Sequence, residues 1–92
     1  MDNSSILTIL KTDLEISGTS RDEMLENMIE VAKAAISREG ITLSDSVDDG
    51  MLIEAYAAFL YRKRREDVVA MPRSLRYLLN NRLLSEKGKS EQ

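Results

Sequence analysis

The segment from Met71 to Leu83, MPRSLRYLLNNRL, decides the expected fold of this chain. Pro72 opens the segment and suits the first position of a helix, where no backbone donor is needed. Leucines then recur at three- and four-residue spacing, which predicts a helix with one apolar face. The residues of that face expected to enter the core are Leu75, Leu78 and Leu79, and Leu83 continues it.

The same helical periodicity continues upstream, and no stretch alternates polar and apolar residues like a strand. Helices are expected over about residues 4–14, 21–38, 47–65 and 72–84. Ser20 with Glu23 and Ser46 with Asp49 have the spacing of capping boxes. The sequence therefore predicts an all-α fold, a compact bundle of about four helices with a flexible C-terminal tail. The other expected core residues are Leu10, Leu25, Ile29, Leu52, Tyr56, Phe59 and Leu60.

The length of 92 residues predicts one domain with a single core of modest size. Residues 1–84 form the expected helical domain. Residues 85–92, SEKGKSEQ, are polar and have no apolar period. We expect this tail to be disordered when the chain is alone.

Composition argues against an enzyme and against a metal or cofactor site. The chain has no cysteine, so it has no thiolate nucleophile. It also has no histidine, which is the commonest general base near neutral pH and the commonest metal ligand. It has no Ser-x-x-Lys motif and no glycine-rich phosphate loop. Asp45, Asp48 and Asp49 lack the alternating spacing of a calcium loop and are better explained as helix-capping residues.

The sequence does not predict a membrane span or a targeting signal. The apolar runs are too short to span a bilayer, so no membrane association is expected. The N-terminal MDNSSIL carries an acid rather than a basic region, which does not predict a signal peptide. We therefore expect a soluble intracellular protein.

Charge is unevenly divided along the chain. Residues 1–61 contain four Lys or Arg and twelve Asp or Glu, whereas residues 62–92 contain nine and four. The densest cationic cluster is Arg62-Lys63-Arg64-Arg65. Cations at the end of a helix complement its dipole, which is one explanation. The other is contact with nucleic acid or with an acidic surface of another subunit.

Two sets of charged residues are the candidate interaction sites. The candidate basic interface is Arg62, Arg64, Arg65, Arg73, Arg76, Tyr77 and Arg82, and the candidate acidic counter-face is Glu23, Glu26 and Glu30.

A family resemblance covers roughly residues 5–83. The opening ILTILKTDLEI, the Gly40-Ile41 end of the second helix, and the pairs Tyr61-Arg62 and Arg65-Glu66 occur in a characteristic order. The most specific piece is a proline followed by an apolar set and an arginine. This order resembles the head–tail connector (adaptor) proteins of long-tailed bacteriophages. The residues of that piece are Pro72, Leu75, Leu78, Leu79 and Arg82.

The resemblance implies a structural role as a small all-helical neck protein. Such proteins form a ring, commonly of twelve copies, under the portal of a filled capsid, and let packaged DNA pass without reading its sequence. The implied partners are the portal protein, at the basic interface, other copies of the chain, and the next neck or tail-completion protein. In such a ring, we expect the acidic second helix of one copy to meet basic residues such as Arg73 or Arg76 of the next copy. The implied location is the virion neck, after assembly in the host cytoplasm. The chain is shorter than many relatives, chiefly in the loop after Gly40.

Two other functions stay open at this point. Helices two to four are compatible with a helix-turn-helix, which would make the chain a small DNA-binding or regulatory module. The fourth helix has arginines but few of the Asn, Gln, Ser or Thr side chains that usually read base edges, and the chain is acidic overall. A helical partner-binding adaptor would differ from a connector mainly in lacking ring symmetry.

Overall fold

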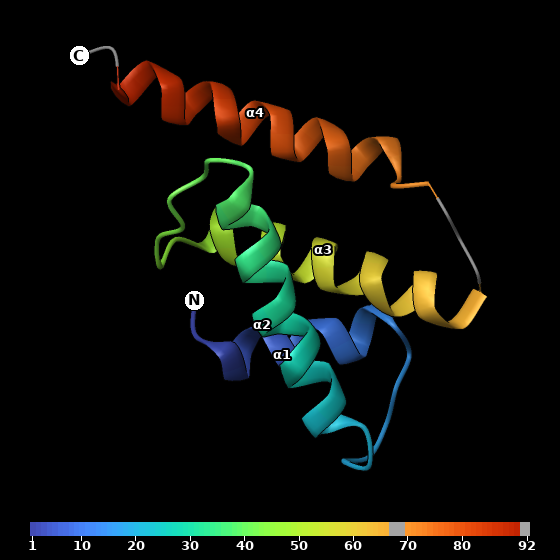
Figure 1. The fold of residues 1–92 in the computed structure, drawn as a ribbon. Coiled ribbons are helices and arrows are strands. Elements are labelled where there is room, and N and C mark those ends of the chain that lie inside the picture. The colour runs from blue at the N-terminus through green and yellow to red at the C-terminus, as the bar shows by residue number, and fades with distance from the viewer. Residues whose placement is uncertain (67–69, 91–92) are drawn as a thin grey trace.

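Four α-helices make up the fold (Figure 1). The computed structural model describes residues 1–66 and 70–90, and contains no strand in these ranges. The helices are α1 (Asn3–Asp13), α2 (Asp22–Arg38), α3 (Val47–Glu66) and α4 (Arg73–Ser90). Each begins within one residue of its predicted start, and the predicted all-α fold is confirmed. Among the described residues, no helix is long and apolar enough to cross a membrane.

The third helix is the centre of the arrangement. α1 and α2 both pack against α3, and α4 packs against α3 as a separate layer. In Figure 1, α4 lies along the top of the molecule and runs in the opposite direction to α3. Because α3 has neighbours on several sides, it buries residues from most of its circumference, including Ile53, Ala57, Ala58 and Tyr61.

The predicted core is largely confirmed, with one correction. Tyr56 and Leu60 are half-buried and pack against the core. Leu78 was expected inside, but 45% of it is exposed. Neighbouring positions on a helix differ by about 100°, so Leu79 can face α3 only if Leu78 turns away. The predicted residues that are buried are Leu10, Leu25, Ile29, Leu52, Phe59, Leu75 and Leu79.

The helix starts differ in how they are capped. The Asp2 carboxylate accepts a hydrogen bond from the backbone N–H of Ser5 (2.8 Å) and caps α1. At α2 the predicted Ser20–Glu23 capping box is absent, because Arg21 takes the N-cap position and makes no side-chain cap bond. At α3 the Ser46 hydroxyl accepts from the Asp49 N–H (3.1 Å), which is one half of the predicted capping box. The other half is absent, because the Asp49 carboxylate binds Ser44 and the Ser46 N–H donates to the Ser44 hydroxyl.

The end of α4 also differs from the prediction. The helix continues past Leu84 to Ser90, so residues 85–90 are helical where a disordered tail was expected. Glu86 explains part of this difference, because its carboxylate accepts from the Thr42 N–H and from Arg82 (both 2.9 Å). The last two residues of the expected tail, 91–92, lie outside the described residues.

Candidate interaction surfaces

A buried ionic cluster fixes α4 to the loop before α3. The Arg82 guanidinium donates to both carboxylate oxygens of Asp49 (2.8 and 3.2 Å), to the Thr42 carbonyl (2.8 Å) and to Glu86 (2.9 Å). Only 17% of the Arg82 side chain is exposed. Arg82, one of the predicted interface cations, is therefore engaged inside its own chain. We call these four residues the α4 latch.

The charges in the α4 latch shift the pKa of its members. Burial raises the pKa of Asp49, but hydrogen bonds from Arg82 and Ser44 outweigh burial and leave it below its ordinary value. Hydrogen bonds from Thr42 and Arg82 lower the pKa of Glu86 to about 2. Both carboxylates are therefore ionised at neutral pH, and the latch is a network of charge-assisted hydrogen bonds.

A second ion pair holds the first turn of α4. Arg76 donates from both terminal nitrogens to the two carboxylate oxygens of Glu39, each at 3.1 Å. These hydrogen bonds raise the pKa of Arg76. Glu39 is the C-cap of α2, so this pair ties α4 to the end of α2. Like Arg82, Arg76 has a partner within the subunit.

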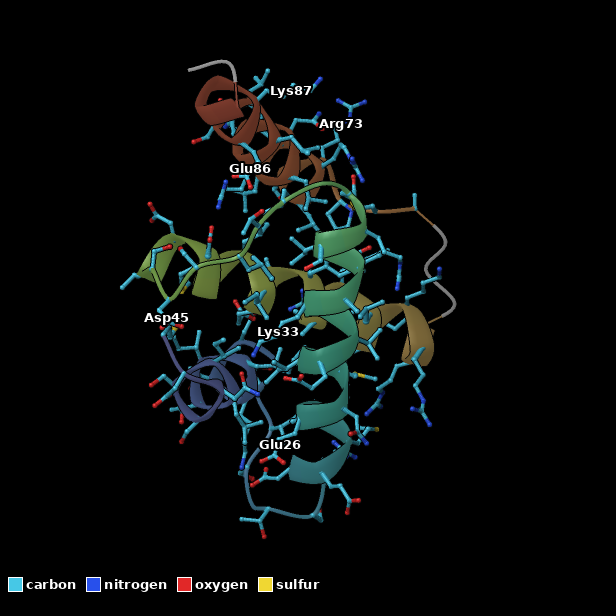
Figure 2. The ribbon with its side chains drawn as sticks, turned by 60° about the vertical axis from the view of Figure 1, so that its left-hand side comes forward. Glu26, Lys33, Asp45, Arg73, Glu86 and Lys87 are labelled. Carbon is cyan, nitrogen blue, oxygen red and sulfur yellow. The ribbon has the colours of Figure 1, made fainter. Side chains whose placement is uncertain are left out.

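The opposite side of α4 is exposed. Tyr77 and Leu84 are seven residues apart and therefore share one side of the helix, with 66% and 67% of each exposed. Arg73 and Lys87 fall on the same side at helical spacing and are exposed. Arg73 is the first residue of α4, and Lys87 lies near its end; both are labelled in Figure 2. We call this set of four residues the outer face of α4.

A groove lies between α2 and the C-terminal part of α3. It has a volume of about 610 Å³. Met24, Met28, Val31 and Leu60 supply its apolar lining, with Glu23 and Arg64 among its polar residues. Glu26 and Glu30, the other residues of the predicted acidic counter-face, are exposed on the same helix. Of these, Glu30 accepts from Asn3 (2.8 Å) and pairs with Lys33 (3.4 Å).

The cationic cluster at the end of α3 does not act as one patch. Arg64 lines the groove, whereas Arg62 and Arg65 line a separate polar pocket of about 400 Å³ next to α1. Arg62 pairs with Asp13 (3.3 Å), and Arg65 donates to the Tyr61 hydroxyl (3.1 Å). The structure therefore divides the predicted basic residues of this cluster between two places.

One titratable group of the interior was not anticipated from the sequence. Glu54, near the middle of α3, is only 6% exposed, and its Oε2 atom has no hydrogen-bond partner. Burial raises the pKa of Glu54 to about 7, and a shared hydrogen bond and charge repulsion with Asp13 add to this rise. Arg62 opposes it. Its burial could have been predicted from its place on the helix, because Glu54 lies on the same side of α3 as Ala57 and Ala58.

These surfaces carry no arrangement typical of metal-dependent chemistry. Within residues 1–66 and 70–90, no group of three or more acidic side chains is placed to hold a metal ion. Comparison with known proteins gave no significant match to a family model, a curated protein or a solved structure. The function is therefore argued from the surfaces of the molecule.

Proposed function

We propose that this chain is a structural subunit that associates head to tail with its own copies and serves as a connector under the portal of a tailed bacteriophage. The observation that carries the association is the separation of charge across the molecule. Arg73 and Lys87 lie on α4 at one end, and Glu26 lies on α2 near the opposite end (Figure 2). The connector role itself rests on the resemblance of the sequence to that family.

Opposite charge at two ends favours a heterologous interface. In such an interface one surface of a copy meets a different surface of the next, and the contact repeats until it closes into a ring or extends as a filament. Complementary charges fix the register of this contact and speed the encounter. A template such as a portal ring would select the closed form. The proposed location is then the virion neck, where DNA passes through the ring and a further neck or tail-completion protein docks.

The internal ion pairs refine which cations are available for this contact. Arg76 and Arg82 already hold carboxylates of their own subunit, at Glu39 and Asp49. Arg73 forms no ion pair among the described residues, and it is exposed. Of the predicted interface cations on α4, Arg73 is therefore the one best placed to meet an acidic surface of another copy.

The direct test is native mass spectrometry of the chain mixed with the portal protein of the same genome. We expect a complex in which the portal ring carries about a dozen added copies, the number that the family resemblance implies, in a closed ring. Failure of the chain to add to the portal would overturn the connector role. Salt-dependent binding to duplex DNA with sequence preference, in the same preparation, would instead favour the regulatory module.

Charge reversal provides the matched variants for this assay. Arg73→Glu should prevent addition to the portal and leave the monomer folded, because the side chain is exposed. Arg38→Glu, on the exposed end of α2, makes the same change in net charge and should assemble normally. Arg76→Glu is a poorer test, because it also breaks the pair with Glu39. Normal assembly of the Arg73 variant would contradict the proposed contact through this residue.

A further inference from the structure

The polar pocket between the end of α1 and the end of α3 directs hydrogen-bond donors at one buried hydroxyl. The Tyr61 hydroxyl accepts from Arg21 (3.4 Å) and from Arg65 (3.1 Å). Tyr61 is only 7% exposed, so the packing of the core fixes the position of its hydroxyl. All three residues line the pocket, which has a volume of about 400 Å³. We propose that these three side chains bind the oxyanion of a phosphate group.

The hydrogen bonds of the Tyr61 hydroxyl leave one donor without an acceptor. A tyrosine hydroxyl has two lone pairs and one hydrogen. Arg21 and Arg65 occupy the lone pairs, and no atom of residues 1–66 and 70–90 accepts the hydroxyl hydrogen. Each guanidinium has five N–H donors and uses only one of them here. A ligand that completes this arrangement must therefore supply acceptors, as an oxyanion does.

Charge favours an anionic ligand over a neutral acceptor. The two guanidinium groups share one oxygen, so their bonded nitrogens are no farther apart than two hydrogen-bond lengths, and their charges repel. In the described part of the chain, neither Arg21 nor Arg65 forms an ion pair. An anion between them replaces this repulsion with charge-assisted hydrogen bonds. Planar guanidinium groups match the oxygens of phosphate, which makes phosphate the favoured class.

The position of Arg21 is unfavourable for α2, which points to a role outside the helix. Arg21 is the N-cap of α2 and makes no side-chain cap hydrogen bond. Arginine offers no acceptor to the first-turn N–H groups, and its charge opposes the helix dipole. Asp22 is in the first turn, but Lys11 holds its carboxylate at 2.7 Å. An anion bound at Arg21 offsets this conflict, because it places negative charge near the positive end of the dipole.

Carboxylates in the same pocket limit its affinity for a phosphate. Asp13 is already paired with Arg62 (3.3 Å). Glu15 and Glu66 also line the pocket and are exposed. Their charges repel a bound anion, so removal of either charge should strengthen binding.

This pocket is separate from the contact proposed for self-association, which uses Arg73 of α4. The phosphate site therefore goes beyond the connector role and does not depend on it. A phosphodiester of DNA and a free phosphate share the chemistry that the three side chains recognise. A competition experiment separates these two sources.

An NMR titration with inorganic phosphate tests the site. The Nε–Hε signals of the arginines are followed in isotope-labelled protein at constant ionic strength, with sodium chloride as the balancing salt. We expect the signals of Arg21 and Arg65 to shift along one saturating curve. Arg73, exposed on the outer face of α4, is the internal control and should show only the weak linear shift of non-specific ion binding. Shifts of Arg21 and Arg65 no larger than that of Arg73 would overturn the proposal.

Two tyrosine variants isolate the contribution of the hydroxyl. Tyr61→Phe keeps the buried ring and should weaken phosphate binding about tenfold, because a hydrogen bond to a charged ligand is lost. Tyr77→Phe removes a hydroxyl from a residue that is 66% exposed on the outer face of α4, and should bind as the parent does. Circular dichroism checks that both variants fold. Equal affinity of the two variants would contradict the role of Tyr61.

Glu66→Gln tests the pocket without a change to any buried residue. This variant removes one competing charge from an exposed position and should raise the affinity for phosphate several-fold. An affinity equal to that of the parent would place the phosphate outside this pocket and contradict the proposal. Binding by Glu66→Gln and not by the parent would show that the carboxylate of the chain itself fills the site, which would also overturn it.

Competition with a short duplex DNA identifies the source of the phosphate. The DNA is added to protein saturated with inorganic phosphate, and the signals of Arg21 and Arg65 are followed. Displacement of the phosphate would support the site and assign it to the DNA backbone. Retention of the phosphate would support the site and assign it to a small phosphate-bearing molecule. The portal assay examines the contact through α4, so failure of either proposal leaves the other standing.

Discussion

Arg82 and Asp49, 33 residues apart in sequence, form a bidentate ion pair that joins α4 to the first turn of α3. The two N–O distances are 2.8 and 3.2 Å. Asp49 also accepts from the N–H and the hydroxyl of Ser44, at 2.8 and 2.9 Å. Four hydrogen bonds therefore satisfy one buried carboxylate. Planar guanidinium groups suit this recognition, which lysine cannot reproduce.

Removal of the Arg82 guanidinium should destabilise the fold strongly. Arg82→Ala leaves the buried Asp49 carboxylate with Ser44 alone, and the expected loss in unfolding free energy is about 3 kcal/mol. Urea denaturation followed by circular dichroism measures this difference. Arg73→Ala, on the exposed side of the same helix, should change stability by less than about 0.5 kcal/mol. Similar losses for both variants would show that the α4 latch does not hold the helix.

The α4 latch should also make the protein sensitive to acid. The pKa of Asp49 in the folded state lies below its ordinary value, so its ionised form stabilises the fold at neutral pH. This contribution should be lost as the pH falls below about 4, where the unfolded chain takes up the proton more readily. Asp49→Asn should be less stable at pH 6 and should lose less stability on acidification. A parent and variant with parallel pH profiles would refute this role.

The helices could be predicted from the sequence because their signals are local. Apolar spacing, together with Pro72 and the candidate capping residues, placed all four starts within one residue, and Ser46 capped α3 as expected. Leu78 shows the limit of this approach. Three leucines in the segment 75–79 fit one broad apolar face, but the side on which the neighbouring helix packs decides which of these leucines is buried. Only the packed position of α4 on α3 assigns Leu79 inward and Leu78 outward.

The ionic contacts could not be predicted, because each joins distant parts of the chain. Asp49 was recognised as a capping residue, but no local pattern indicated that Arg82 would reach it across 33 residues. The same holds for Arg76 and Glu39, which are 37 residues apart. Charge distribution alone gave the basic and acidic sets. It could not separate cations used within the subunit from those left on its surface.

Two glycines should respond in opposite ways to the same substitution. Gly40 ends α2 with a φ of +103°, where a side chain is strained, so Gly40→Ala should cost about 1–2 kcal/mol of stability. Gly88 lies within α4 with open space around its Cα, so Gly88→Ala should gain about 0.5 kcal/mol. Thermal or urea unfolding measures both. A loss of stability in Gly88→Ala would argue against a continuous helix at that position.

Glu54 should make stability fall as the pH rises through neutrality. Its pKa is about 7 in the folded state, above the ordinary value of 4.5, because burial and the neighbouring Asp13 disfavour the charged form. The folded state therefore holds this proton more tightly than the unfolded state, and deprotonation of Glu54 opposes folding. The folded-state pKa and the ordinary pKa of Glu54 set the pH range of this effect. Unfolding free energy should decrease between about pH 5 and pH 7.5.

Glu54→Gln removes the titration and keeps the size of the side chain. At pH 8 this variant should be more stable than the parent by roughly 3 kcal/mol, the equivalent of the shift in pKa, and its stability should be nearly flat across the window. Glu26→Gln, at an exposed position of α2, serves as the control and should follow the parent profile. A direct carbon NMR titration of the Glu54 carboxyl should give a midpoint near 7. A midpoint close to 4.5, or an unchanged slope in Glu54→Gln, would show that the ionised carboxylate is tolerated in the interior, with Arg62 as its compensating charge.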